Sequence, residues 1–205
     1  MANPPFTERL ADYVRTLRLG PGVEPTTDIG PLIGERYRHK VEEHVEEARA
    51  KGARLLAGGR RPPQFERGFF YEPTVLTGVD HSFRIMREET FGPVLSITTA
   101  ADADEAIRFA NDSDYGLGAT VYTNDLRLAM QAMESIKAGT FWINDPLTDN
   151  DAGPFGGMRH SGIGRELGAE GLDAFREPKH VHLDYVMERK PWFFPYRDRR
   201  RGSGD

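Results

Sequence analysis

Two adjacent acids precede an aromatic residue in the segment EETFGPV, residues 88–94. A carboxylate at the point where a loop enters a strand can accept hydrogen bonds from ligand hydroxyls, as acidic residues do from a ribose. The neighbouring Phe91 could stack on a flat ring. The simpler interpretation is a lead-in to a strand, with solvated acids and a core phenylalanine, and the residue types alone favour it. The segment is a candidate ligand site that needs support from elsewhere in the chain.

Glycines are concentrated in a second segment, residues 153–166, with the sequence GPFGGMRHSGIGRE. Five glycines and one proline in fourteen residues exclude a regular helix or strand. Glycine is used where the backbone needs a positive φ or approaches another group closely. The run therefore predicts a shaped loop, and such loops on rigid scaffolds often carry function.

The residues that most often carry out catalysis or bind metals are scarce. The chain has no cysteine, which excludes disulfides, thiolate metal sites and a cysteine nucleophile. No serine lies in a Gly-x-Ser-x-Gly nucleophile turn. His180 and His182 would share one face of a strand, but no third metal ligand is evident beside them. We therefore predict no catalytic residue and no metal ligand in this chain.

Composition narrows the class of protein. The 205 residues are 38% hydrophobic and carry a formal net charge of −5. This length suits one globular domain with an appended arm, and the charge gives no overall attraction for nucleic acid. No apolar run approaches the roughly 20 residues that a membrane span needs, and the N-terminus lacks the basic and apolar regions of a signal peptide. We expect a cytoplasmic protein that binds neither nucleic acid nor membranes.

Helices and strands are predicted to alternate along the chain. Apolar residues at helical spacing predict helices, and short apolar or alternating runs predict strands. The predicted helices span about 6–19, 35–51, 102–111, 126–136 and 166–174, and the strands about 53–57, 69–79, 91–98, 117–123, 139–144 and 180–186. This order predicts an α/β fold, with a mostly parallel sheet flanked by helices.

Two local expectations concern the surroundings of the candidate site. The nearly continuous apolar residues Val94, Leu95 and Ile97 predict a strand that is buried on both faces. His39 and His44 lie five residues apart on a charged helix, which is the wrong spacing for ligands on one helical turn. We therefore expect both histidines to face solvent.

The last predicted strand, residues 180–186, has one apolar face formed by Val181, Leu183 and Tyr185. A late amphipathic strand of this kind can pair with another subunit. It can equally be an edge strand folded back on its own domain, and the pattern favours neither interpretation. The three arginines at 199–201 could contact nucleic acid or an acidic partner, but a disordered solubilising tail is the preferred interpretation.

Four motifs resemble signatures of the aldehyde dehydrogenase superfamily. They are EETFGPV at 88–94, NDSDYGLGA at 111–119, AGTFWIN at 138–144, and PFGG with SGIGRE within 154–166. They occur in the order and at the spacing that are familiar in the family, and the resemblance extends from about Phe6 to about Val186. The chain is identified as similar to the C-terminal part of such enzymes: most of the catalytic domain and the final strand used for oligomerisation.

The resemblance implies roles for five residues. Glu89 resembles the residue that binds the hydroxyls of the nicotinamide ribose, and Phe91 resembles the residue that packs beside the nicotinamide ring. Phe155 resembles an aromatic residue of the aldehyde tunnel, and Asp149 and Asn150 lie in the variable loop that helps to choose the substrate. The implied cofactor is NAD or NADP. The polar character of the variable loop hints at a polar or amine-bearing aldehyde.

The resemblance also implies what the chain cannot do alone. The family's mechanism requires a cysteine nucleophile, a general-base glutamate, a side-chain amide for the oxyanion and a Rossmann-like cofactor domain. We expect the chain to start just downstream of the nucleophile, and so to be a truncated NAD(P)+-dependent aldehyde dehydrogenase that is inactive by itself. The alternative is a non-catalytic oligomerisation or regulatory module that associates with full-length relatives.

Domain limits and partners follow from the same resemblance. Residues 1–178 are expected to form the portion of the catalytic domain, 179–187 the oligomerisation strand and 188–205 an aromatic and basic tail. We expect a homo-oligomer, or association with an aldehyde dehydrogenase N-terminal half or full-length relative. Because the missing segments would normally cover part of this surface, we also expect an exposed apolar area.

Overall fold

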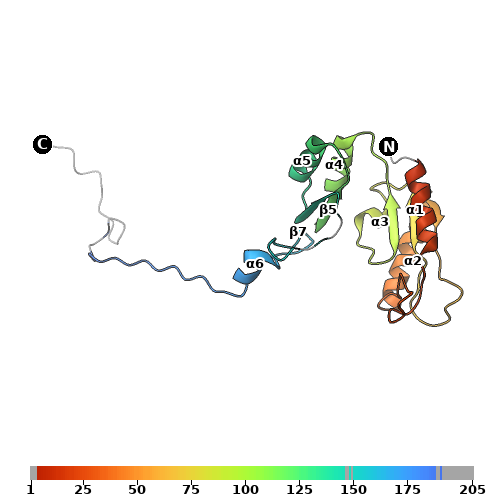
Figure 1. Ribbon diagram of the computed structural model, residues 1–205, viewed down its shortest axis with the longest axis horizontal. Helices are drawn as coiled ribbons and strands as arrows, with labels where there is room; N and C mark the ends of the chain where they lie inside the picture. The colour runs from red at the N-terminus through yellow and green to blue at the C-terminus, as the bar shows by residue number, and fades with distance from the viewer. Residues whose placement is uncertain (1–3, 146–147, 149, 188–189, 191–205) are drawn as a thin grey trace.

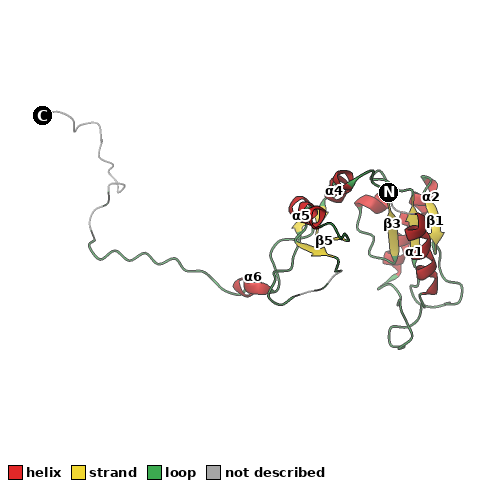
Figure 2. Cartoon of the chain, turned by 45° about the horizontal axis from the view of Figure 1, so that its top comes forward, coloured by secondary structure: helices red, strands yellow, loops and turns green. Residues whose placement is uncertain are grey.

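The computed structural model describes residues 4–145, 148, 150–187 and 190. Within these ranges the chain forms an N-terminal part and a C-terminal part, which are joined by residues 98–102 and followed by an extended segment (Figure 1). In the secondary-structure colouring of Figure 2, strands gather in two separate places, one beside α1 (Pro4–Thr16) and the other beside α5 (Leu126–Ser135). The sheet is therefore divided between the two parts.

A three-stranded sheet forms the core of the N-terminal part. Its strand β2 (Thr74–Thr77) is antiparallel to β1 (Arg54–Ala57) and parallel to β3 (Val94–Ile97). Adjacent residues of a strand face opposite sides of a sheet. Accordingly, the fully buried Val75 packs with residues of α1, and the fully buried Leu76 packs with residues of α2 (Glu35–Ala50). The two helices thus cover opposite faces of the sheet.

The spacing of small and apolar residues explains why α2 lies on this sheet. Val41, Val45 and Ala48 recur every three or four residues and are all fully buried, whereas the remaining face of the helix is charged. A short helix, α3 (Arg84–Arg87), follows β2 and packs against α2. It carries the chain toward the segment EETFGPV, which leads into β3.

The C-terminal part is built on two pairs of strands. The strands β5 (Gly118–Val121) and β6 (Thr140–Ile143) are parallel and are connected through α5, and the short strands β4 (Tyr115–Gly116) and β7 (Met158–Arg159) are antiparallel. The helices α4 (Ala103–Asn111) and α6 (Gly168–Asp173) complete this part. Side-chain caps begin two of its helices: Asp102 accepts a hydrogen bond from the Glu105 amide, and Asp125 accepts hydrogen bonds from the Arg127 and Leu128 amides.

The predicted alternation of helices and strands is confirmed, and so is the type of every element predicted between residues 6 and 174. The elements α3, β4 and β7 were not predicted, because two to four residues are too few to show a period. The expectation that residues 91–98 form a strand buried on both faces is wrong. Leu95 is 49% exposed, because β3 is an edge strand and α1 packs on β1 and β2 instead.

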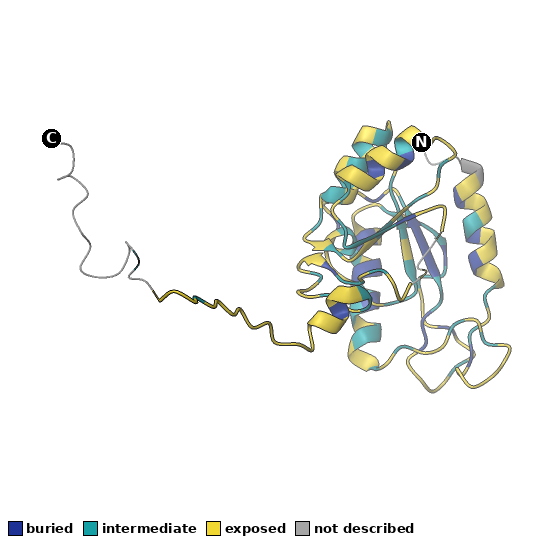
Figure 3. Ribbon diagram, turned by 60° about the vertical axis from the view of Figure 1, so that its left-hand side comes forward, coloured by how far each residue is buried: buried dark blue, intermediate teal, exposed yellow. Residues whose placement is uncertain are grey.

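The segment that follows α6 runs away from both parts in an extended conformation (Figures 1 and 3). Val181, Leu183 and Tyr185 are exposed along it, and Leu95 is exposed on β3. An apolar area that the missing segments would cover stays a prediction. No paired strand is recorded for residues 180–186 within the described ranges, so the protruding segment is extended but is not part of a sheet. Its pairing with another subunit stays a prediction. The tail at 188–205 lies outside the described residues apart from Lys190, which forms an ion pair with Asp184.

Within the described ranges, no helix combines the length and the apolar character that crossing a bilayer would need.

Candidate functional site

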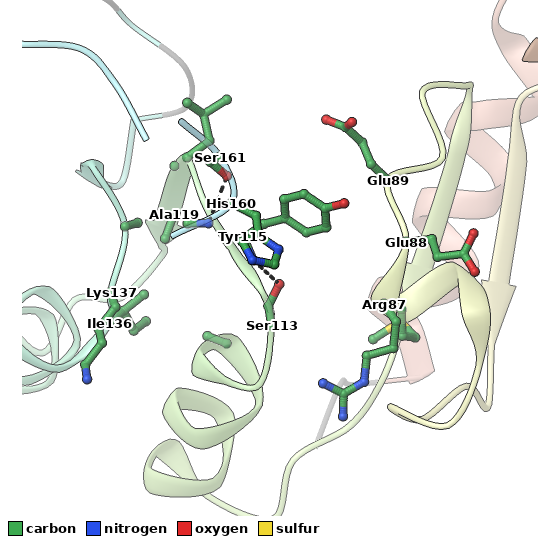
Figure 4. A pocket seen from close by; sticks show the side chains of 16 residues that line it. Arg87, Glu88, Glu89, Ser113, Tyr115, Ala119, Ile136, Lys137, His160 and Ser161 are labelled. Atoms are coloured by element: carbon green, nitrogen blue, oxygen red, sulfur yellow. Dashed lines mark hydrogen bonds between the residues drawn. The ribbon is translucent and has the colours of Figure 1, made fainter. Parts of the chain in front are cut away.

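A cavity of about 610 Å³ lies between the N-terminal and C-terminal parts. One wall is formed by Arg87, the last residue of α3, and by Glu88 and Glu89, which follow it. The other wall comes from β4, β5 and the glycine-rich loop, and includes Tyr115, His160 and Ser161 (Figure 4). The structure therefore brings two of the sequence motifs, EETFGPV and NDSDYGLGA, to opposite sides of one cavity.

Hydrogen bonds hold the glycine-rich loop against the wall that carries Tyr115. The Gly116 amide donates to Ser161 Oγ at 2.9 Å, and the His160 amide donates to the backbone carbonyl of Asp114 at 3.0 Å. The rings of Tyr115 and His160 meet edge to face, with their centroids 6.4 Å apart. The antiparallel pairing of β4 with β7, which lies within the loop, also joins the loop to this wall through backbone contacts. The predicted shaped loop is thus a structural partner of the preceding motif.

Close backbone approach explains why glycines are used in this loop. A Cβ atom on Gly139, at the start of β6, would lie 1.6 Å from the carbonyl oxygen of Gly156. No side chain fits in that space, so the loop crosses the strand with backbone against backbone. The loop also closes on itself, because Phe155 and Glu166 exchange two backbone hydrogen bonds of 2.7 Å.

Of the two adjacent acids, Glu89 is the one that is free to bind a ligand. Its carboxylate lines the cavity, and within the described part of the chain no hydrogen bond or ion pair occupies it. Phe91, two residues later, has a positive φ of 49° and a side chain that is 69% exposed. It is therefore not a core phenylalanine, so the simpler interpretation of this segment fails for Phe91, whereas the exposed Glu89 agrees with it as a solvated acid.

Glu88 is held by two partners on the opposite side of the segment. Arg84 Nε and Nη2 donate to its two carboxylate oxygens at 2.9 and 3.1 Å, and His44 Nε2 lies 3.1 Å from Oε2. These hydrogen bonds, with that of Arg84 the strongest, lower the pKa of Glu88 to about 2. Glu88 is thus a structural carboxylate, and the pair of acids divides into one that is bound within the protein and one that is free.

The expectation that His44 faces solvent is wrong, because its side chain is 0% exposed. Its position three residues after Val41 places it on the buried face of α2. A buried imidazole needs hydrogen-bond partners, and His44 has them in Glu88 and in Thr90, whose Oγ1 lies 3.0 Å from Nδ1. His39 is exposed as expected, beside Glu43.

A second cavity, of about 360 Å³, contains two other residues that the sequence singled out. Phe155 and Asn150 both line it, together with Trp142 and Asp145. The Trp142 indole N–H donates to the backbone oxygen of Thr148 at 2.8 Å, which holds the variable loop over β6. Asp149, the remaining predicted residue, lies outside the described residues.

The structure therefore separates the five predicted site residues. Glu89 lies in the first cavity, Phe155 and Asn150 lie in the second, and Phe91 is among the lining residues of neither. Sequence reasoning missed the roles of Tyr115, His160, Ser161 and Trp142 in these walls. All four lie in or beside the motifs that carried the resemblance, so the motifs were the available signal, but only the folded chain shows which of their side chains face a cavity.

Comparison with known proteins identifies relatives of the chain. The chain is 40% identical over 190 residues to the betaine aldehyde dehydrogenase of Bacillus subtilis, a match that covers 92% of this chain and 39% of that protein. It is 41% identical over 187 residues to a chloroplastic aminoaldehyde dehydrogenase of Arabidopsis thaliana, covering 91% of this chain and 37% of the relative. The chain thus spans about two fifths of the length of these relatives.

The same relationship holds at the level of structure. A crystal structure of betaine aldehyde dehydrogenase from Staphylococcus aureus in complex with NAD+ matches with a TM-score of 0.87 and 39% identity, covering 94% of this chain and 39% of that one. The expected α/β fold is thereby confirmed. The sequence profile described as "Aldehyde dehydrogenase family" matches residues 2–181. Because that match includes nearly all of the described residues, the chain belongs to the aldehyde dehydrogenase family.

Proposed function

We propose that this chain forms one side of the active site of an NAD(P)+-dependent aldehyde dehydrogenase, the side that binds the nicotinamide ribose and part of the aldehyde. The observation that carries the proposal is the unpartnered Glu89 carboxylate, which faces a cavity in a chain of this family. The chain spans only about two fifths of its relatives, so the activity belongs to an assembly that includes the rest of such an enzyme.

The residues present fit the nicotinamide half of the cofactor. Ribose hydroxyls are donors, and an ionised carboxylate with unused lone pairs is the acceptor that suits them. Glu89 offers such a carboxylate, and the exposed ring of Phe91 is free to lie against a flat heterocycle. When bound, the nicotinamide accepts a hydride from the substrate. The contribution of this chain is to hold and orient the sugar beside that reaction. That the relatives include a structure in complex with NAD+ supports NAD as the cofactor.

The second cavity supports an amine-bearing aldehyde as the substrate. It combines the aromatic rings of Trp142 and Phe155 with the carboxylate of Asp145. Aromatic faces and a nearby carboxylate attract ammonium groups, including quaternary ones. Relatives named for betaine aldehyde and for aminoaldehydes point to the same class of substrate.

The lack of cysteine motivates the proposal that the chain alone does not oxidise aldehydes. The family's reaction needs a thiolate nucleophile, and loss of a nucleophile costs many orders of magnitude in rate. We therefore expect activity only when a second polypeptide segment supplies the nucleophile. The cytoplasmic location expected from the sequence stays a prediction.

Complementation tests this function directly. The chain is co-expressed with the part of the Bacillus subtilis relative that it does not match, and NADH formation is followed with betaine aldehyde as substrate. The assembly is expected to form NADH, whereas either half alone is not. Glu89→Gln should weaken NAD+ binding, and Glu66→Gln, on an exposed loop away from both cavities, serves as the matched control. Lack of NADH from an assembly that forms and folds would contradict the proposal.

A second candidate function is a non-catalytic module that joins relatives through the extended segment. The observation that favours it is the exposed row of Val181, Leu183 and Tyr185, which alternates with polar residues along an unpaired stretch of backbone. Light scattering measures the mass of mixtures with a full-length relative. A mixed oligomer that is lost in the double variant Val181→Asp with Leu183→Asp, but kept in the control His182→Asp, would support this function. A complex that survives the double variant would refute it.

A further inference from the structure

One face of α2 contacts three consecutive residues of the segment that carries Glu89. The His44 ring nitrogens lie 3.1 Å from Glu88 Oε2 and 3.0 Å from Thr90 Oγ1. Lys40, one helical turn earlier, donates its Nζ proton to the backbone carbonyl of Glu89. The helix therefore binds the residue before the free carboxylate, the residue after it and the backbone between them.

The same segment also lies against a buried side chain of α2 between these two residues. A Cβ atom on Gly92 would lie 2.3 Å from Cγ2 of Val41, which is fully buried between Lys40 and His44. The chain at Gly92 thus rests directly on the helix, and any larger residue there would push it away. Contacts at both ends leave residues 88–92 little freedom to rotate.

These contacts decide where the Glu89 side chain points. In extended backbone, successive side chains point to opposite sides, and Glu88 is extended with φ −102° and ψ 145°. Because Glu88 and Thr90 both reach His44, they face α2, and Glu89 between them must face away from it. Figure 4 shows the Glu88 and Glu89 carboxylates pointing in different directions, the latter toward the cavity.

The chemistry of the imidazole suits this bridge. A carboxylate only accepts hydrogen bonds, so His44 Nε2 carries the proton that Glu88 receives. The other ring nitrogen, Nδ1, pairs with the Thr90 hydroxyl, a group that can both donate and accept a hydrogen bond. One buried ring thereby satisfies two groups on either side of Glu89, which neither a phenyl ring nor a single amide at this position does.

We propose that His44 is a positioning residue of the cofactor site: by bridging Glu88 and Thr90 it directs the Glu89 carboxylate into the cavity, where that carboxylate binds sugar hydroxyls of the nicotinamide half of the cofactor. The part played by the sugar rests on the proposed function, whereas the orientation of Glu89 does not. The experiment therefore has two arms that can fail separately.

The first arm uses the chain alone. Amide hydrogen exchange of residues 88–92 is compared in His44→Phe, which keeps a ring of similar volume, and in His39→Phe, the control on the exposed face of the same helix. Exchange is expected to quicken by about tenfold or more in His44→Phe, as the loss of two ordinary hydrogen bonds would give, and to stay unchanged in the control. Thr90→Val, which removes one of the two bonds without touching the core helix, should give a smaller increase. If the segment stays equally protected in both variants, the positioning role is refuted.

The second arm uses the complemented assembly and two probes, NAD+ and ADP, the latter lacking the nicotinamide riboside. His44→Phe is expected to raise the Kd for NAD+ by about tenfold and to leave the Kd for ADP unchanged. His44→Gln, whose amide can reach one partner, should recover part of the loss. In a double variant with Glu89→Gln, the loss should equal that of Glu89→Gln alone, because His44 acts through Glu89.

The outcomes distinguish this inference from the proposed function. Equal weakening of NAD+ and ADP in His44→Phe, or additive losses in the double variant, would show a merely structural role and overturn the inference. If Glu89→Gln itself leaves NAD+ binding unchanged, the proposed function fails, and the first arm still decides whether His44 orients Glu89.

Discussion

Arg87 and Asp112 form a bidentate ion pair that joins the N-terminal and C-terminal parts of the chain. Arg87, at the end of α3, places Nη1 and Nη2 each 2.8 Å from one carboxylate oxygen of Asp112, which follows α4. His81 Nδ1 lies 2.8 Å from the same carboxylate, and Arg87 lowers the pKa of Asp112 most strongly. Because Arg87 immediately precedes Glu88 and Asp112 precedes Tyr115 by three residues, this pair connects the two walls of the first cavity.

Arg87→Ala is expected to loosen the two parts without unfolding either. The variant loses the paired hydrogen bonds to Asp112 and a further one from Nε to the His81 carbonyl. Hydrogen exchange should quicken at residues 112–116, and the difference should shrink at high salt, since the side chains are partly exposed. Arg108→Ala is the control, because among the described residues Arg108 forms its ion pair within its own helix, with Glu105 at 3.5 Å. Equal exchange in the two variants would show that other contacts hold the cavity together.

Leu76→Ala is expected to lower the free energy of unfolding by about 2–5 kcal/mol, the range for removing a fully buried leucine. Leu76 lies in the middle of the core between β2 and α2, so the neighbours cannot close the gap completely. Leu95→Ala, on the neighbouring strand β3 but half exposed, should cost far less. Urea denaturation followed by circular dichroism measures both. Similar midpoints would mean that the β2 core does not limit stability.

Gly139→Ala is expected to dislodge the glycine-rich loop, because the added Cβ would collide with the Gly156 carbonyl. Overpacking of this kind costs about 1–3 kcal/mol, and here the obstacle is backbone, which cannot rotate aside. Limited proteolysis should cut within residues 153–166 faster than in the unchanged chain. The control is Gly22→Ala, since nothing lies within 4 Å of a Cβ at Gly22. An intact loop in Gly139→Ala would show that the loop can shift without penalty.

Asp28 is expected to contribute to the loss of stability in acid. Hydrogen bonds from the side chain and the backbone of Arg18 lower the pKa of Asp28 to about 2, from an ordinary value of 3.8. A carboxyl whose pKa is lower in the folded state stabilises the fold above its unfolded pKa, so this contribution is complete above about pH 3.8 and disappears toward pH 2.

Thermal unfolding between pH 5 and pH 2 tests this contribution of Asp28. Measurements at intervals of roughly one-half pH unit resolve the slope of stability against pH, which reports the difference in bound protons between the unfolded and folded states. Asp28→Asn should reduce the slope of melting temperature against pH in that window. Arg18→Ala removes the side-chain hydrogen bonds but leaves the backbone amide bond to Asp28, so adding Asp28→Asn in that background should change the slope less than it does in the unchanged chain. A slope that is the same in all variants would place the acid sensitivity at other carboxylates.

Local sequence patterns determined the secondary elements because their causes are local. The helix α2 was predictable from the spacing of Val41, Val45 and Ala48, and the alternation of helices with strands was predictable from apolar periods. The glycine run was recognisable as a shaped loop for the same reason, since glycine density limits regular structure wherever it occurs. The prediction for Leu95 failed because its burial depends on how far α1 covers the sheet face beyond β2, and no local pattern contains that information.

The sequence predicted a set of candidate site residues but not where those residues lie relative to one another in the folded chain. The resemblance singled out Glu89, Phe155 and Asn150, each of which lines a cavity, yet it did not show that Glu89 lies apart from the other two. The prediction for His44 failed because a histidine on a charged helix looks the same in sequence whether or not the folded chain places hydrogen-bond partners beside it.

The sequence by itself determined the family, the order of helices and strands, and the absence of a cysteine nucleophile in these residues. Only the tertiary structure decided that Glu88 forms hydrogen bonds within the protein and that Glu89 lines the cavity with its carboxylate unoccupied by described residues. It also decided that His44 contacts the residues on either side of Glu89. The physical reason is distance along the chain: His44 and Glu88 are 44 residues apart. Which of two neighbouring carboxylates gains a partner depends on how α2 packs beside the segment before β3.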